Sequence, residues 1–154
     1  MPVLDKLLQL ADAYAPTTAA APATNGTYLD GVVPQDYGMG NGPDIGFLVQ
    51  VHASITGTSG GTFTVRLQAA TDSAFTSPVD VLIGDTITQS DFATKAVAGI
   101  QLMRRKIPRG YSYRYWRFAV TIATHDLSGG SFDAWLGDNG LFQDNVAYAG
   151  NYTP

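Results

Sequence analysis

The sequence predicts an all-β protein, and a jelly-roll-like antiparallel β-sandwich is the architecture that fits it best. Apolar and polar residues alternate with a period of two along several segments. Short turns rich in Gly and Pro separate those segments, and helical spacing is confined to brief stretches. Counting the segments gives about eight short strands, enough for two packed sheets.

The clearest alternation lies between Asp44 and Ala70, on both sides of a turn of Gly, Ser and Thr at 56–61. Even positions carry polar residues such as Gln50, His52 and Arg66. The odd positions are apolar: Phe47, Val49, Val51, Ala53, Ile55, Phe63, Val65, Leu67 and Ala69. We therefore predict two strands that form an antiparallel hairpin with one buried face.

A second pair of strands is predicted at 100–107 and 112–124, around a Pro-Arg-Gly turn. In the later strand the even positions would face the core: Trp116, Phe118, Val120 and Ile122. Four residues share the opposite face: Tyr111, Tyr113, Tyr115 and Arg117. Either they stand on an outer contact surface, since Tyr and Arg are enriched at interfaces, or another part of the chain covers them.

Shorter elements complete the prediction. Strands are expected at 79–83 and 131–137, and a helical turn is expected within 90–99. In the last strand Phe132, Ala134 and Leu136 alternate with Trp135 on the other face.

The chain is expected to have an N-terminal arm at 1–26, a sandwich domain at 27–140 and a C-terminal tail at 141–154. Within the arm, Leu4, Leu7, Leu8 and Ala11 have the spacing of a short helix over 2–14. A Pro- and Ala-rich extended segment follows to residue 26. The arm is either a helix on a tether or a segment that lies across its own domain.

Composition restricts the classes of function. Of the 154 residues 45% are hydrophobic and only 14% are charged, against about 25% in typical soluble domains. Either the loops are polar but uncharged, or part of the surface packs against other proteins.

The formal net charge of -4 argues against bulk nucleic-acid binding. No apolar run approaches the ~20 residues that span a bilayer, so we expect no membrane partner. The N-terminus lacks the regions of a signal peptide, so we expect synthesis in a cytoplasm.

We expect no enzyme activity. The two histidines, His52 and His125, have no nucleophile motif such as Gly-x-Ser-x-Gly to serve. Glu is absent, and the aspartates lack the spacing of a calcium loop. Cys is absent as well, which excludes thiolate ligands and disulfides. Accordingly, no catalytic residue, no metal site and no cofactor is predicted.

Basic residues are concentrated in one stretch. Six of the nine lie within 104–117: Arg104, Arg105, Lys106, Arg109, Arg114 and Arg117. On a hairpin they would form a positive patch with tyrosines between them. Such a patch could pair with an acidic protein surface, contact nucleic acid, or simply be solvated strand ends.

Five groups of short motifs occur in a particular order. They are Leu-Leu-Gln-Leu-Ala-Asp-Ala-Tyr-Ala at 7–15; Ala-Thr-Asn and Tyr-Leu-Asp-Gly at 23–31; Asp-Ile-Gly and Leu-Val-Gln-Val at 44–51; Thr-Val-Arg-Leu-Gln and Ala-Phe-Thr-Ser-Pro at 64–78; and Ile-Pro-Arg-Gly and Tyr-Trp-Arg-Phe at 107–118. In this order the chain, over residues 4 to 136, resembles the small capsid cement proteins of tailed bacteriophages, also called stabilisation or decoration proteins.

The resemblance implies a jelly-roll protein without enzyme activity that sits outside an icosahedral shell and clamps neighbouring major capsid protein subunits. It also implies a homo-oligomer, with a dimer favoured and a trimer as the other option, located on the virion exterior after synthesis in the bacterial host. The alternative is a carbohydrate-binding jelly roll, in which Trp116, Trp135 and the tyrosines would stack on sugars. The resemblance supplies no contact residues, so these are expected from the patterns described above: Leu4, Leu7, Leu8, Tyr14, Arg104, Arg105, Lys106, Tyr111, Tyr113, Tyr115 and Arg117.

Overall fold

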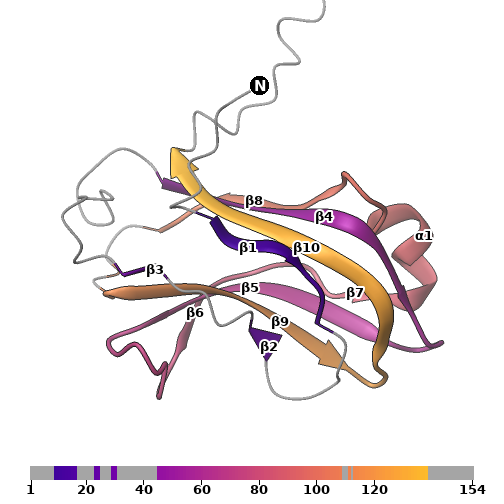
Figure 1. Ribbon diagram of the computed structural model, residues 1–154, viewed down its shortest axis with the longest axis horizontal. Coiled ribbons are helices and arrows are strands. Elements are labelled where there is room, and N and C mark those ends of the chain that lie inside the picture. The colour runs from indigo at the N-terminus through magenta and orange to yellow at the C-terminus, as the bar shows by residue number, and fades with distance from the viewer. Residues whose placement is uncertain are drawn as a thin grey trace, which may run out of the picture.

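The computed structural model describes residues 9–16, 23–24, 29–30, 45–108, 111 and 113–138. Two antiparallel sheets pack face to face (Figure 1). The first sheet has the strand order β1 (Gln9–Tyr14), β10 (Leu127–Asp138), β4 (Ile45–Gly57), β8 (Gln101–Lys106). The second has the order β2 (Ala23–Thr24), β9 (Tyr115–Ala123), β5 (Thr62–Ala70), β6 (Val79–Ile83), with β3 (Leu29–Asp30) pairing β9 and β7 (Ile87–Thr88) pairing β5.

The path of the chain between these strands is that of a jelly roll. From β5 to β6 and β7 the chain stays in the second sheet, whereas it changes sheets between β4 and β5, β7 and β8, β8 and β9, and β9 and β10. The strand orders β1-β10-β4-β8 and β2-β9-β5-β6, connected in this way, form the double Greek key of a jelly roll. The predicted all-β sandwich of jelly-roll type is confirmed.

The hairpin predicted over 44–70 is wrong, although both of its strands exist. β4 pairs with β10 and β8, and β5 pairs with β9, β6 and β7, so the two strands lie in different sheets. Their odd-numbered residues do not share one sheet face; Phe47 belongs to the inner face of the first sheet and Phe63 to the inner face of the second. A period of two shows which side of a strand is buried, but not whether its successor lies beside it or opposite it.

The second predicted hairpin is wrong for the same reason. β8 pairs with β4 in the first sheet, whereas β9 pairs with β5 in the second. The basic residues of β8 and those near β9 are therefore carried by different sheets, and the single positive patch expected from a hairpin does not form.

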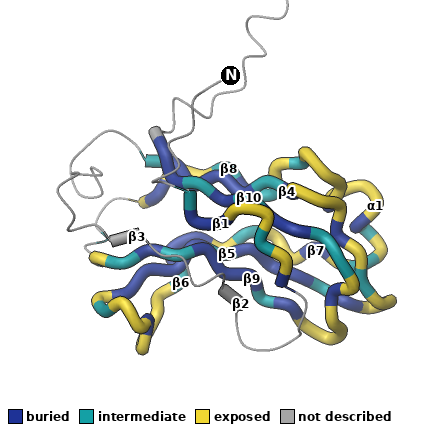
Figure 2. The backbone as a smooth tube through the Cα atoms, in the orientation of Figure 1, coloured by how far each residue is buried: buried dark blue, intermediate teal, exposed yellow. Residues whose placement is uncertain are grey.

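The core between the sheets contains the residues that alternation assigned to it, except Ala53, which is exposed beside the register shifts between β4 and β10. Trp116, Phe118 and Val120 are fully buried, and Ile122 is nearly so. The rings of Phe63 and Phe132 lie 5.4 Å apart, and Phe132 lies 6.1 Å from Phe118. Figure 2 shows the buried positions along the strands of both layers. Each such side chain contributes about 1.5–3 kcal/mol to the free energy of unfolding.

The helix predicted over 2–14 is wrong where the structure describes it, since Gln9–Tyr14 is strand β1. It pairs with β10, from Gln9 opposite Trp135 to Tyr14 opposite Phe132, with two register shifts. A short isolated helix is marginal in water, whereas the edge of β10 offers backbone partners. Pairing there also buries Leu10 and Ala11. Leu4, Leu7 and Leu8 lie outside the described residues.

The smaller elements occur where the sequence predicted them. Strands occur at Val79–Ile83 and, within β10, at 131–137. The helical turn consists of a 3₁₀ segment (Gln89–Asp91) and α1 (Phe92–Lys95). Among the described residues, no helix has the length and apolar character needed to cross a membrane.

Two glycines with left-handed backbone allow a matched test of this packing. Gly99 has φ +89° and a Cβ there would meet only Gln50 Nε2 at 3.9 Å, whereas Gly130 has φ +105° and its Cβ would lie 2.6 Å from Ile55 Cα. Gly99→Ala should lower the free energy of unfolding by about 1–2 kcal/mol, the cost of the backbone conformation alone. Gly130→Ala should lower it by about 3 kcal/mol or more, because β4 cannot move away without breaking its pairing with β10. Urea denaturation of both variants measures the difference, and equal losses would contradict the close approach of β10 to β4.

Candidate functional site

The expected contact residues that the structure describes lie in four different places. Tyr14 ends β1, three cations end β8, Tyr111 and Tyr113 precede β9, and Tyr115 and Arg117 belong to β9 itself. The structure therefore does not bring them together in one site. Arg109 lies outside the described residues.

Tyr14 points into the sandwich. Its ring packs edge-on against Phe118 with centroids 6.3 Å apart, and the side chain is half-buried. Burial raises the pKa of its hydroxyl above the ordinary value. The ring thus serves the core, and only part of it is available for an outside contact.

The β8 cations occupy the edge of the first sheet. Arg105 Nη1 donates a hydrogen bond of 3.4 Å to the backbone carbonyl of Ile83, at the end of β6 in the opposite sheet. Arg104 and Lys106 also have partners within the chain. Charged residues on an edge strand discourage pairing with another chain, which is a sufficient role for this group.

The tyrosines do not share one outer face, as alternation had suggested. Tyr111 and Tyr113 are partly buried against the core, with their rings 6.1 Å apart, and the Tyr113 carbonyl accepts a 2.9 Å hydrogen bond from Trp116 Nε1. β9 begins only at Tyr115, so strand geometry does not extend back to them. Tyr115 alone joins Arg117 on the outer side of the second sheet.

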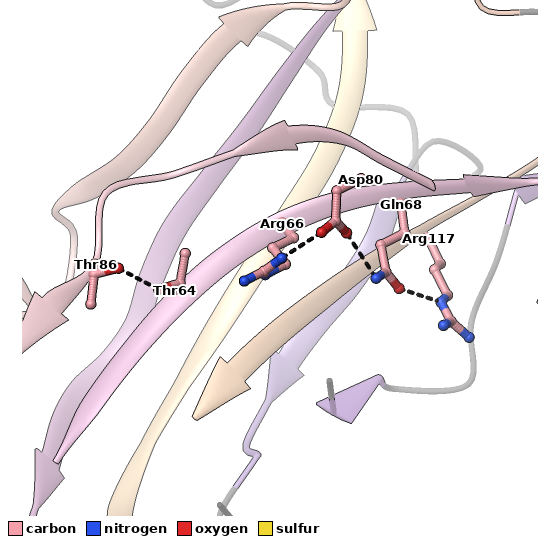
Figure 3. Close-up of polar contacts among 6 residues, drawn as sticks. All are labelled: Thr64, Arg66, Gln68, Asp80, Thr86 and Arg117. Atoms are coloured by element: carbon pink, nitrogen blue, oxygen red, sulfur yellow. Dashed lines mark hydrogen bonds and ion pairs between the residues drawn. The ribbon is translucent and has the colours of Figure 1, made fainter. Parts of the chain in front are cut away.

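The outer face of the second sheet carries a connected set of polar side chains, drawn in Figure 3. Asp80 on β6 pairs through one carboxylate oxygen with Arg66 Nη1, and its other oxygen accepts a 2.9 Å hydrogen bond from Gln68 Nε2. Gln68 Oε1 in turn accepts a 3.0 Å bond from Arg117 Nε. We call Arg66, Gln68, Asp80 and Arg117 the arginine network. Strand register explains it, because Gln68 lies opposite both Asp80 and Arg117.

Phe75 supports the arginine network from the loop between β5 and β6. The guanidinium carbon of Arg117 lies 4.2 Å from the centroid of the Phe75 ring, which is buried on this outer side of the sheet. Burial lowers the pKa of Arg117 from its ordinary value. The cation is thus held in a defined position, partly removed from water.

Asp72 fixes the loop that carries Phe75. Its carboxylate accepts hydrogen bonds from the backbone amides of Thr76 at 3.2 Å and Ala74 at 3.0 Å, and from Thr76 Oγ1 at 3.0 Å. The bond from the Thr76 amide is the main cause that lowers the pKa of Asp72, and burial opposes it. The loop is therefore held by a charged carboxylate.

The outer face of the first sheet carries the titratable pair His52 and Asp133. His52 Nδ1 lies 2.9 Å from Asp133 Oδ2, and the other oxygen of Asp133 accepts a 2.7 Å bond from the Ala13 amide. The His52 side chain is half exposed, and no hydroxyl nucleophile is bonded to it in the part of the chain that the structure describes. Nor do the described residues contain three or more His, Cys, Asp or Glu side chains placed to hold a metal. Asp133 on β10 thus ties the backbone of β1 through Ala13 and holds the His52 ring on β4.

Sequence reasoning missed Phe75 and Asp80 as parts of a site. Alternation did place Arg66 and Gln68 on a polar face, and this signal was available. The contributions of the β6 strand and the preceding loop depend on sheet order, which the sequence does not reveal.

The chain matches a known protein family. The family model described as Bbp16 matches residues 10–136, which is most of the chain and includes all of the arginine network. The name of this family suggests a bacteriophage-related protein. No curated protein matches the chain.

The Asp72 loop should respond to acid. Because its folded-state pKa is lowered, ionised Asp72 stabilises the fold above its unfolded-state pKa, and this stabilisation is lost as the pH falls through the folded-state value. An NMR titration of the Asp72 carboxyl should give a midpoint below the ordinary value of 3.8, with the Thr76 amide shift following it. Asp72→Asn is the control, since it keeps an oxygen acceptor but removes the titration. A midpoint at or above 3.8 would be inconsistent with the bonds from Thr76 and Ala74.

Proposed function

The chain belongs to the Bbp16 family, and we propose that it is a structural protein of a phage virion that binds the outside of the capsid. There it stabilises the shell by bridging neighbouring major capsid protein subunits. Its place of action is the capsid exterior, and it is made in the cytoplasm of the bacterial host. It acts as a homo-oligomer, a dimer in preference to a trimer.

The observation that carries this proposal is the organised outer face of the second sheet. A buried core supports it from below, and hydrogen bonds and ring contacts hold its arginine and tyrosine side chains in place. Arginine and tyrosine side chains supply much of the binding energy of protein interfaces. Because these are already held in place, ordering them on binding costs little free energy. A rigid domain with a polar and aromatic outer face suits repeated contacts on a symmetric shell.

The mechanism is mechanical. A protein that binds the assembled shell but not the free subunits favours assembly by mass action. Contacts of moderate strength, repeated by symmetry and joined in an oligomer, add up through avidity without any deep pocket. The chemistry required of the protein is therefore recognition alone.

The carbohydrate alternative loses part of its platform. It placed Trp135, Trp116 and the tyrosines on one sugar-binding surface, but Trp116 is fully buried in the core, and Trp135 lies on the other sheet from Tyr115. Tyr111 and Tyr113 also pack partly against the core.

The proposal predicts that the purified protein sediments with expanded empty shells of its phage and raises the temperature at which they disassemble. At a free concentration about a hundred times its Kd, the expected stabilisation is about 2.7 kcal/mol per site. Co-sedimentation and differential scanning calorimetry of shells with and without the protein measure both effects. Light scattering on the isolated protein gives its oligomeric state. Shells that neither bind the protein nor melt later in its presence would refute the proposal.

A further inference from the structure

We propose that the outer face of the second sheet is the surface that meets the partner, and that Arg117 binds a carboxylate of an acidic segment of that partner there. The identity of the partner as the capsid protein rests on the proposed function. The carboxylate site itself rests on the arginine network.

Arg117 presents an open guanidinium fork. Its Nε is used by Gln68 at 3.0 Å and its flat face by Phe75, which together set its position and direction. Figure 3 shows the bond from Nε to Gln68, and among the described residues neither Nη atom of Arg117 has an acceptor. A guanidinium held in this way offers two parallel N–H groups, the geometry that a carboxylate matches with two hydrogen bonds.

The charge of the network is not balanced from within. Among the described side chains, Arg66 and Arg117 are two cations, and Asp80 is the one anion bonded to the network. Both oxygens of Asp80 are already engaged, one by Arg66 and one by Gln68. The network thus carries a net charge of +1 beside a guanidinium that burial has partly desolvated. One carboxylate would neutralise it.

The same face has further polar groups without partners. Arg66 Nε and Thr121 Oγ1 are buried and make no hydrogen bond to any described residue. The two residues lie on neighbouring strands of the same face. Arg66 on β5 is opposite Ala119 on β9, and Thr121 lies two residues further along β9, opposite Thr64. A buried unpaired polar group costs about 1–3 kcal/mol, and such groups gathered on one face are typical of functional surfaces rather than of framework.

The surroundings of the network have the composition of a protein interface. Tyr115 stands two residues from Arg117 on the same face, with the guanidinium carbon of Arg114 4.9 Å from its ring centroid. On the other side Ile83, paired in register with Arg66, is 47% exposed. A central charge flanked by aromatic and aliphatic side chains is the arrangement found at interface hot spots.

A carboxylate fits this surface better than a nucleic acid does. The network has one unit of unbalanced charge, which a single carboxylate neutralises, rather than the track of cations that a phosphate backbone requires. The β8 cations are also weaker candidates, because Arg105 bonds the Ile83 carbonyl and Arg104 and Lys106 have partners within the chain.

The test compares variants of the full chain in co-sedimentation with purified shells. Arg117→Met keeps an unbranched side chain over Phe75 but removes the fork, and should weaken shell binding about tenfold or more. Arg117→Lys keeps the charge without the fork, and should fall between Arg117→Met and the wild type. Lys95→Met is the matched control, because it removes an exposed cation that pairs with Asp91 on the short helix; its binding should stay within about twofold of wild type. Thermal denaturation checks folding, and the comparison rests on Arg117→Lys if Arg117→Met is unstable.

Each outcome separates the two proposals. If the wild type binds shells and the Arg117 variants bind equally well, this inference is overturned and the proposed function stands. If Arg104→Met weakens binding and Arg117→Met does not, the contact lies on β8 and the inference is again overturned. If the wild type does not bind shells, the proposed function fails, and a titration with a hexaglutamate peptide decides on the carboxylate site. The Arg117 Nε–Hε signal in a ¹⁵N NMR spectrum should then shift with hexaglutamate, and an unchanged signal, or tighter binding of decathymidylate, would overturn the site.

Discussion

One face of each long strand is apolar, and the two sheets bury these faces against each other. Trp116, Phe118 and Val120 from β9 have no exposed surface, and the rings of Phe63, Phe118 and Phe132 make one continuous contact between the layers. Side chains of this size dominate the free energy of unfolding. Because alternate residues of a strand point in opposite directions, burying one set fixes the direction of the other. The outer surface of the protein is therefore determined by the packing of its core.

The points at which the chain changes sheet determine which residues come together on that surface. The chain passes from β8 in the first sheet to β9 in the second, so a stretch rich in arginine and tyrosine is divided between two places. The β8 cations come to a sheet edge, where one of them bonds the opposite sheet. Arg117 comes to a central position between β5 and the short strands that pair with β9. Residues that are neighbours in sequence thus have different environments, and separate roles follow.

The side chains on the outer face of the second sheet are held in place by many contacts, yet some of their polar groups have no hydrogen-bond partner among the described residues. Gln68 is the relay, donating to Asp80 and accepting from Arg117, and the Asp72 loop brings Phe75 under the same guanidinium. A side chain placed by so many contacts loses little further entropy when a partner binds. The unbalanced positive charge of the network favours a partner with an anionic group. In the proposed role on a capsid, such a surface would select its partner without a change of conformation.

The sequence by itself determined the class of fold, most of the strands and the buried face of each, because a period of two is a property of the single strand. It also determined the low charge and the polar face that includes Arg66 and Gln68. Only the tertiary structure decided which strands are neighbours, and both predicted hairpins failed there. It also turned residues 9–14 into a strand, since the free edge of β10 outweighs a weak helical preference. Asp80 and Phe75 joined Arg117 for the same reason: pairing between distant strands depends on the whole core, and no local pattern carries that information.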